Sequence, residues 1–111
     1  MLNLFARKEN EIDFVDIQGK LDTGNSSELG ELLRELLDGN ASKIILNFSK
    51  LDYISSNGLR EILDAGKRLI STNGKLVMCR SNPIVYDVLR ISGFSKMFEV
   101  YKSEEEAIAS F

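Results

Sequence analysis

Short apolar runs alternate along this 111-residue chain with longer segments in which apolar residues recur at helical spacing. Residues 43–48 have the β-branched and aromatic content of a buried strand, and the leucines between 29 and 37 repeat at intervals of three and four, as on one face of a helix. Strands that alternate with helices of about three turns favour right-handed crossovers, so this order predicts a mostly parallel sheet. The expected strands are at 2–5, 12–17, 43–48, 75–79 and 96–101. Between the second and third of these we expect a helix that ends at Gly39-Asn40, and between the third and fourth a helix that carries Leu59 to Ile70. Ser81 or Asn82 would cap a helix after the fourth strand, and Ser103 would open a short helix after the fifth.

The two N-terminal strands are joined by the short polar segment Glu9-Asn10-Glu11, which favours an antiparallel hairpin. We therefore expect an α/β fold with a single domain over residues 1–111. Its central sheet would be mostly parallel, with an antiparallel N-terminal edge strand and about four flanking helices. In open sheets of this kind the working surface usually lies beyond the carboxyl ends of the strands. The turns expected at that edge are Asp22–Asn25, Asp52–Gly58 and Arg80–Pro83.

Composition excludes several classes of function. The chain has no histidine, which removes Ser-His-Asp and Cys-His catalysis and the usual zinc site. Its net charge of −3 argues against a nucleic-acid partner. No apolar stretch approaches the roughly 20 residues that cross a bilayer, so we expect no direct membrane contact. The single Cys79 is expected to pack as a small hydrophobic residue in a cytoplasmic protein.

Loops that bind phosphate groups are also missing. Gly66-Lys67 lies within a helical pattern and lacks both the preceding glycine and the following hydroxyl of a P-loop. No Gly-x-Gly-x-x-Gly follows a strand, so the dinucleotide-binding fingerprint is absent. A response-regulator receiver would need adjacent carboxylates after its first parallel strand, whereas Asp22 stands alone. We therefore expect no cofactor and no metal ion.

Ser55 and Ser56 lie on the expected turn between the 43–48 strand and the next helix. A serine oxygen there can accept hydrogen bonds from the unpaired amides of the first helical turn. The same amides also favour a negative group such as a phosphate. From the residues alone, both uses of the serine pair stay open.

The stretch Leu51-Asp52-Tyr53-Ile54-Ser55-Ser56-Asn57-Gly58-Leu59 resembles the signature of STAS domains, above all of bacterial anti-sigma factor antagonists. Further landmarks of that family are matched in order along the chain. These are Gly19-Lys20-Leu21-Asp22, Asn73-Gly74-Lys75-Leu76, and Ile91-Ser92-Gly93-Phe94 ahead of Phe98.

The resemblance implies a phosphorylation switch that regulates transcription, in a protein with no enzymatic activity of its own. In such proteins the unmodified form binds an anti-sigma factor serine kinase and so releases a sigma factor. The kinase uses ATP to phosphorylate a serine on the turn, and a PP2C-type phosphatase restores it. By position the matching residue is Ser56, which would then also cap the helix, with Ser55 as the less favoured site. This chain departs from the family's Asp-Ser-[Ser/Thr]-Gly-Leu form at Ser55 and Asn57.

The resemblance also suggests a partner surface around that serine. The residues expected on it are Asp22, Thr23, Ser55, Asn57, Gly58 and Arg60. The protein itself would be a monomer or a weak homodimer. Two other interpretations remain: a STAS scaffold of another partner-switching pathway, or a STAS module that binds a nucleotide.

Overall fold

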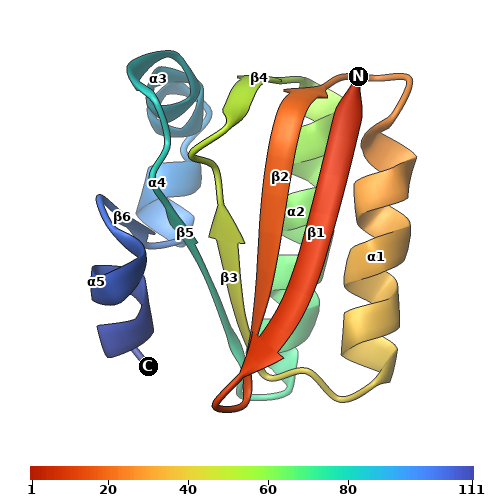
Figure 1. The fold of residues 1–111 in the computed structure, drawn as a ribbon, viewed down its shortest axis with the longest axis vertical. Helices are drawn as coiled ribbons and strands as arrows, with labels where there is room; N and C mark the ends of the chain where they lie inside the picture. Colours follow the sequence, from red (N-terminus) through yellow and green to blue (C-terminus); the bar gives the residue numbers. More distant parts are fainter.

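Six strands and five helices follow one another along the chain in a computed structural model that describes residues 1–111 (Figure 1). The elements are β1 (Leu2–Glu9), β2 (Ile12–Leu21), α1 (Ser26–Asp38), β3 (Lys43–Asn47), β4 (Leu51–Ile54), α2 (Ser56–Ser71), β5 (Lys75–Cys79), α3 (Pro83–Ile91), α4 (Phe94–Met97), β6 (Val100–Tyr101) and α5 (Glu104–Ala109). None of the five helices combines the length and the apolar content that a membrane-spanning helix requires.

The sheet has the order β1-β2-β3-β5-β6, and β4 pairs with β2 beyond the end of β3. Only β1 and β2 are antiparallel, in a register that runs from Leu2 opposite Gly19 to Glu9 opposite Ile12. All other strand pairs are parallel. The structure therefore confirms the expected α/β fold with an antiparallel N-terminal edge.

Gly19 marks the point where β2 changes partner from β3 to β4. The β2–β4 register shifts between Gly19 and Lys20, and Gly19 has a φ of 96°, a conformation that residues with a side chain rarely adopt. A Cβ at this position would also strike the Met1 carbonyl oxygen. The bulge lets β4 carry the chain beyond β3, so that α2 begins at the carboxyl edge of the sheet.

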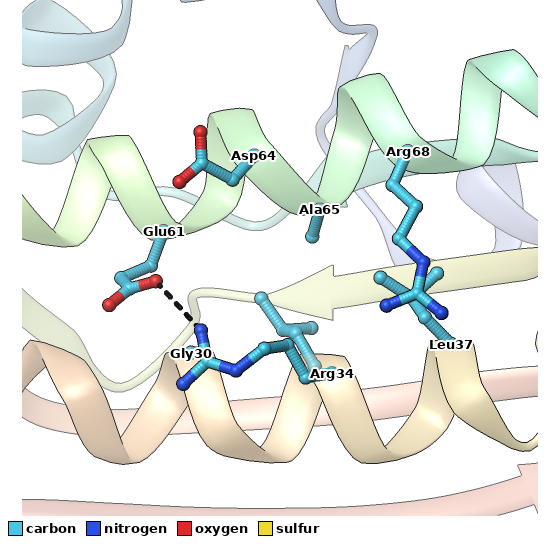
Figure 2. A pocket seen from close by; sticks show the side chains of 8 residues that line it. Gly30, Arg34, Leu37, Glu61, Asp64, Ala65 and Arg68 are labelled. Carbon is cyan, nitrogen blue, oxygen red and sulfur yellow. Dashed lines mark ion pairs between the residues drawn. The ribbon is translucent and has the colours of Figure 1, made fainter.

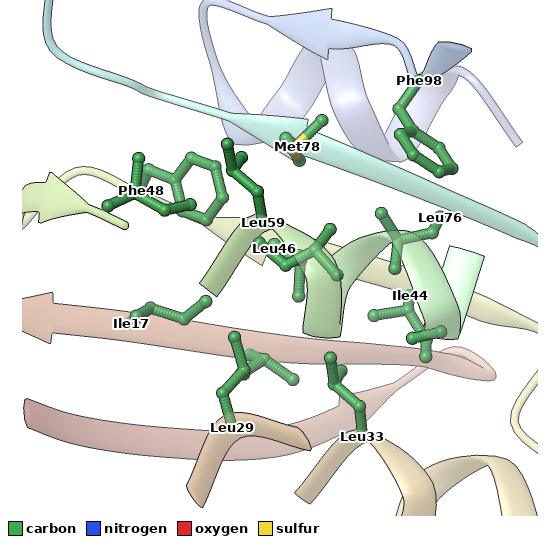
Figure 3. Close-up of a cluster of buried hydrophobic side chains, with 14 of the residues drawn as sticks. Ile17, Leu29, Leu33, Ile44, Leu46, Phe48, Leu59, Leu76, Met78 and Phe98 are labelled. Atoms are coloured by element: carbon green, nitrogen blue, oxygen red, sulfur yellow. The ribbon is translucent and has the colours of Figure 1, made fainter. Parts of the chain in front are cut away.

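The main core lies between the sheet and helices α1 to α4. Figure 3 shows its centre, where Ile17, Ile44 and Leu46 of the strands meet Leu29 and Leu33 of α1. A smaller cluster on the opposite face lies beneath α5 and consists of Ile12, Phe14, Ile45, Val77, Cys79 and Ala107. Burial raises the pKa of the Cys79 thiol to about 12, and the Glu104 carboxylate adds to this rise. Cys79 therefore packs as the neutral, small hydrophobic residue that we expected.

The structure corrects two of the expected elements. Residues 51–54, interpreted as part of a turn, form β4. The expected 96–101 strand shrinks to Val100–Tyr101, because Gly93, in a left-handed conformation, ends α3 and the short helix α4 follows. Phe94 and Phe98, four residues apart, both point into the core with ring centroids 5.7 Å apart, a spacing that suits a helical turn. The helices therefore number five rather than about four.

The helical spacing of apolar residues in the sequence also predicts buried positions for Ile70 and Ile84, but both side chains are exposed. Ile70 of α2 is 59% exposed and Ile84 of α3 is 68% exposed. Each lies next to a fully buried residue, Leu69 and Val85, and successive helical residues are rotated by about 100°. This rotation takes Ile70 and Ile84 off the buried faces of their helices.

Candidate functional site

Hydrogen bonds join three turns at the carboxyl edge of the sheet, at the top of Figure 1. The Ser55 amide donates to the Leu21 carbonyl oxygen at 2.8 Å, which ties the start of α2 to the end of β2. The Asn82 side-chain amide donates to the Leu51 carbonyl oxygen at 2.9 Å, which ties the start of α3 to β4. The turns that the sequence assigned to this edge therefore do meet there.

Ser55, rather than Ser56, caps α2. Its backbone is extended, with φ −89° and ψ 168°, and its hydroxyl oxygen accepts a hydrogen bond from the Gly58 amide at 3.1 Å. The side chain is buried, with 7% exposed. The expectation that Ser56 would cap the helix is wrong, because the bond from Ser55 to β2 holds Ser55 in the extended conformation of the capping position.

Ser56 is the first residue of α2, and it is exposed. No hydrogen bond within the chain involves its hydroxyl, since Ser55 already satisfies the nearby amide. Ser56 lines an open hollow of about 420 Å³ between α2 and α4. The other lining residues are Leu59, Arg60, Leu63, Asp64 and Phe94. The hydroxyl is thus free, accessible and flanked by both apolar and charged groups.

Asp22 shapes the neighbouring turn. Its Oδ1 accepts hydrogen bonds from the amides of Gly24 at 2.9 Å and Asn25 at 3.0 Å. The Asn25 side chain returns to the same turn, accepting from the Asp22 amide and donating to the Lys20 carbonyl oxygen. Asn25 therefore provides no side-chain cap for α1. Asp22 is half-buried and structurally engaged, whereas Thr23 beside it is exposed.

The remaining residues of the expected partner surface divide between core and solvent. Gly58 is buried, and a Cβ there would come within 2.7 Å of the Leu21 side chain, so glycine allows α2 to approach β2. Asn57 and Arg60 are exposed. The solvent-facing members of the set are therefore Thr23, Asn57 and Arg60, and the exposed Ser56 lies among them in sequence.

Sequence reasoning missed the apolar part of the hollow beside Ser56. Leu63 and Phe94, which the sequence pattern does not assign to any site, line this hollow. The helical spacing of Leu59 and Leu63, one turn apart and just after the serine, was the available signal. Phe94 carried no comparable signal, because α4 was not expected.

A second hollow, of about 230 Å³, separates α1 from α2 away from the serine edge (Figure 2). The Arg34 guanidinium and the Glu61 carboxylate form an ion pair across it, with 3.6 Å between Nη1 and Oε1. Glu61 covers Gly30, and Arg68 pairs with Asp38 farther along at 2.6 Å. Both ion pairs join α1 to α2, so this hollow is part of the contact between the two helices.

The sequence of this chain matches known proteins over most of its length. The family model described as the STAS domain matches residues 4–107. This chain belongs to the STAS domain family. BtrV of Bordetella bronchiseptica, which carries the name of an anti-sigma factor antagonist, is 39% identical over 95 residues, or 86% of this chain and 82% of that protein.

Solved structures share this STAS fold. The crystal structure of an anti-sigma factor antagonist from Mycobacterium paratuberculosis aligns with a TM-score of 0.91 at 14% identity, over 99% of this chain and 93% of that one. The structure of the Bacillus cell fate determinant SpoIIAA in its phosphorylated form aligns with a TM-score of 0.75 at 22% identity, over 99% and 98%. At these identities the likeness shows the fold.

The two serines of this STAS domain should differ sharply in their contribution to stability. Ser55→Ala removes the cap and is expected to lower the free energy of unfolding by about 1 kcal/mol. Ser56→Ala, the matched control, should change it by less than about 0.5 kcal/mol, because this exposed hydroxyl has no partner. Urea denaturation of the two variants measures the difference. A larger loss for Ser56→Ala would show that the cap is assigned to the wrong serine.

Proposed function

We propose that this STAS domain is an anti-sigma factor antagonist that is switched off by phosphorylation of Ser56. The unmodified protein binds an anti-sigma factor that is also a serine kinase, and this binding frees the sigma factor. The proposal rests on the different roles of the two serines in the structure. Ser55 caps α2, while the exposed Ser56 hydroxyl has no role inside the fold. The name of the relative BtrV supports the same function.

The modification is a phosphoryl transfer catalysed by the partner. The Ser56 Oγ attacks the γ-phosphorus of ATP, the bond to the bridging oxygen breaks, and ADP leaves. The hydroxyl proton passes to a base of the kinase. A PP2C-type phosphatase reverses the step, as water attacks the phosphorus, inorganic phosphate leaves and the serine oxygen regains a proton. The STAS domain supplies only the nucleophile, and therefore needs no catalytic group of its own.

The added phosphate would disturb binding far more than folding. A phosphoserine adds about −1.5 to −2 charges and three strong acceptor oxygens. Ser56 lies in the first turn of α2, which contains no acidic residue and where the helix dipole favours a negative group. A docked partner would instead have to desolvate that charge at the contact. The phosphorylated protein would keep its fold and lose its partner.

Mapping the phosphate tests this proposal. Incubation with candidate anti-sigma factor kinases and Mg-ATP, followed by mass spectrometry of peptides, should locate a single phosphate on Ser56. Ser56→Ala should abolish labelling, and Ser55→Ala should retain it despite its lower stability. Labelling of Ser56→Ala at the wild-type level would refute the assignment. A partner that binds but never transfers phosphate would instead favour a STAS scaffold of another pathway.

A further inference from the structure

Arg60 is an arginine without an ionic partner. Four of the six arginines form ion pairs with carboxylates, namely Arg7, Arg34, Arg68 and Arg90. Arg60 and Arg80 form none. Asp64, one turn farther along α2, lines the same hollow as Arg60, yet the two side chains do not form an ion pair. The guanidinium of Arg60 is therefore available to an anion that enters the hollow.

Arg60 follows Ser56 by four residues in α2, and both line that hollow. Residues at this spacing have Cβ atoms about 5 to 6 Å apart on the same side of a helix. An acidic group that precedes a basic group by four residues is also the more favourable of the two orders. Apart from Asp64, the other lining residues are uncharged, namely Leu59, Leu63 and Phe94. Arg60 is thus the one cation of the hollow, placed on the same side of the helix as Ser56.

We propose that Arg60 binds the phosphate of modified Ser56 within the same molecule, an inference that rests on the function proposed above. A guanidinium matches a phosphate group in geometry and can donate two parallel hydrogen bonds to it. In the unmodified protein Arg60 stays free at the partner surface. After phosphorylation it turns to the phosphate, so one modification changes two groups that a partner would meet. Arg60 is in this sense a positioning residue of the switch.

The pair can be tested by phosphorus NMR on protein that carries phosphoserine at position 56, incorporated during synthesis. A nearby cation favours the doubly charged phosphate, so wild-type protein should have a second phosphate pKa about half a pH unit below that of Arg60→Gln. Arg60→Lys keeps the charge but loses the forked geometry, and should fall between them. The difference should shrink in high salt, because the groups are exposed.

Arg80→Gln is the matched control, because it removes the same charge from an exposed, unpaired arginine that does not line the hollow. It should leave the phosphate titration of the wild type unchanged. Equal titrations of wild type and Arg60→Gln, or an equal shift in Arg80→Gln, would overturn the proposal. Because the phosphoserine is installed without a kinase, this result is independent of the mapping experiment. If the shift is found but no kinase labels Ser56, the proposed switch fails and the ion pair stands.

Discussion

Gly66→Ala is expected to lower the free energy of unfolding by about 1 to 2 kcal/mol, although alanine is the better helix former. Gly66 lies in α2 against the ring of Phe98, which is buried in the core with 5% exposed. An added methyl group would overlap that ring, and overpacking of this kind costs about 1 to 3 kcal/mol. The gain in helix propensity, about 1 kcal/mol, offsets only part of this cost.

Gly30→Ala is the matched control in α1. The atoms nearest to its methyl group would be those of the Glu61 carboxylate, the far end of a half-buried side chain that can move aside. We expect this variant to be as stable as the wild type or up to about 1 kcal/mol more stable. Thermal unfolding followed by circular dichroism compares the two, with roughly 4 to 8 °C per kcal/mol for a domain of this size. Equal melting temperatures for Gly66→Ala and Gly30→Ala would contradict the packing of Phe98 against α2.

The sequence predicts most of the fold because strands and helices leave different periodicities. The spacing of the leucines in α1 identifies a helix, and the apolar run of β3 identifies a strand. The alternation of such helices and strands then predicts a parallel sheet. The failures came where tertiary contacts override local pattern. β4 forms because β2 extends past β3 and offers a free edge, and α4 forms because Phe94 and Phe98 both enter the core. Neither partner is visible in the local sequence.

At the candidate site, too, prediction from the sequence fails where tertiary contacts decide the outcome. The position of the serine pair followed from the strand-to-helix pattern and from the family signature. The sequence could not show which serine caps the helix, since the two serines are adjacent and either can act as a cap. That choice depends on the hydrogen bond from the Ser55 amide to the Leu21 carbonyl oxygen, a contact between segments more than 30 residues apart.

Phosphate on Ser56 is expected to weaken binding of the anti-sigma factor kinase by about 100-fold, or about 3 kcal/mol, because the partner would have to desolvate the charged phosphate at the contact. Ser56→Asp carries one charge and a shorter side chain, so it should weaken binding in the same direction by a smaller factor. Neither change should unfold the domain, since Ser56 is exposed at the start of a helix where a negative charge is favourable.

A negative charge added elsewhere on α2 distinguishes the effect of a charge at Ser56 on kinase binding from the effect of the net charge of the protein. Ser71 is the last residue of this helix, about 22 Å from Ser56 along its axis, and it is also exposed. Ser71→Asp should bind the kinase like the wild type, with a small loss of stability because it places a negative charge at the carboxyl end of a helix. Equal weakening by Ser71→Asp and Ser56→Asp would mean that overall charge, rather than the Ser56 surface, controls binding.

The most direct measurement is calorimetric titration of the anti-sigma factor kinase with two forms of this domain, unmodified and phosphorylated at Ser56, alongside the melting temperature of each. We predict tight binding by the unmodified form, about 100-fold weaker binding by the phosphorylated form, and closely similar melting temperatures. Equal affinities of the two forms would contradict the central claim, and so would a loss of binding that merely accompanies unfolding of the phosphorylated protein.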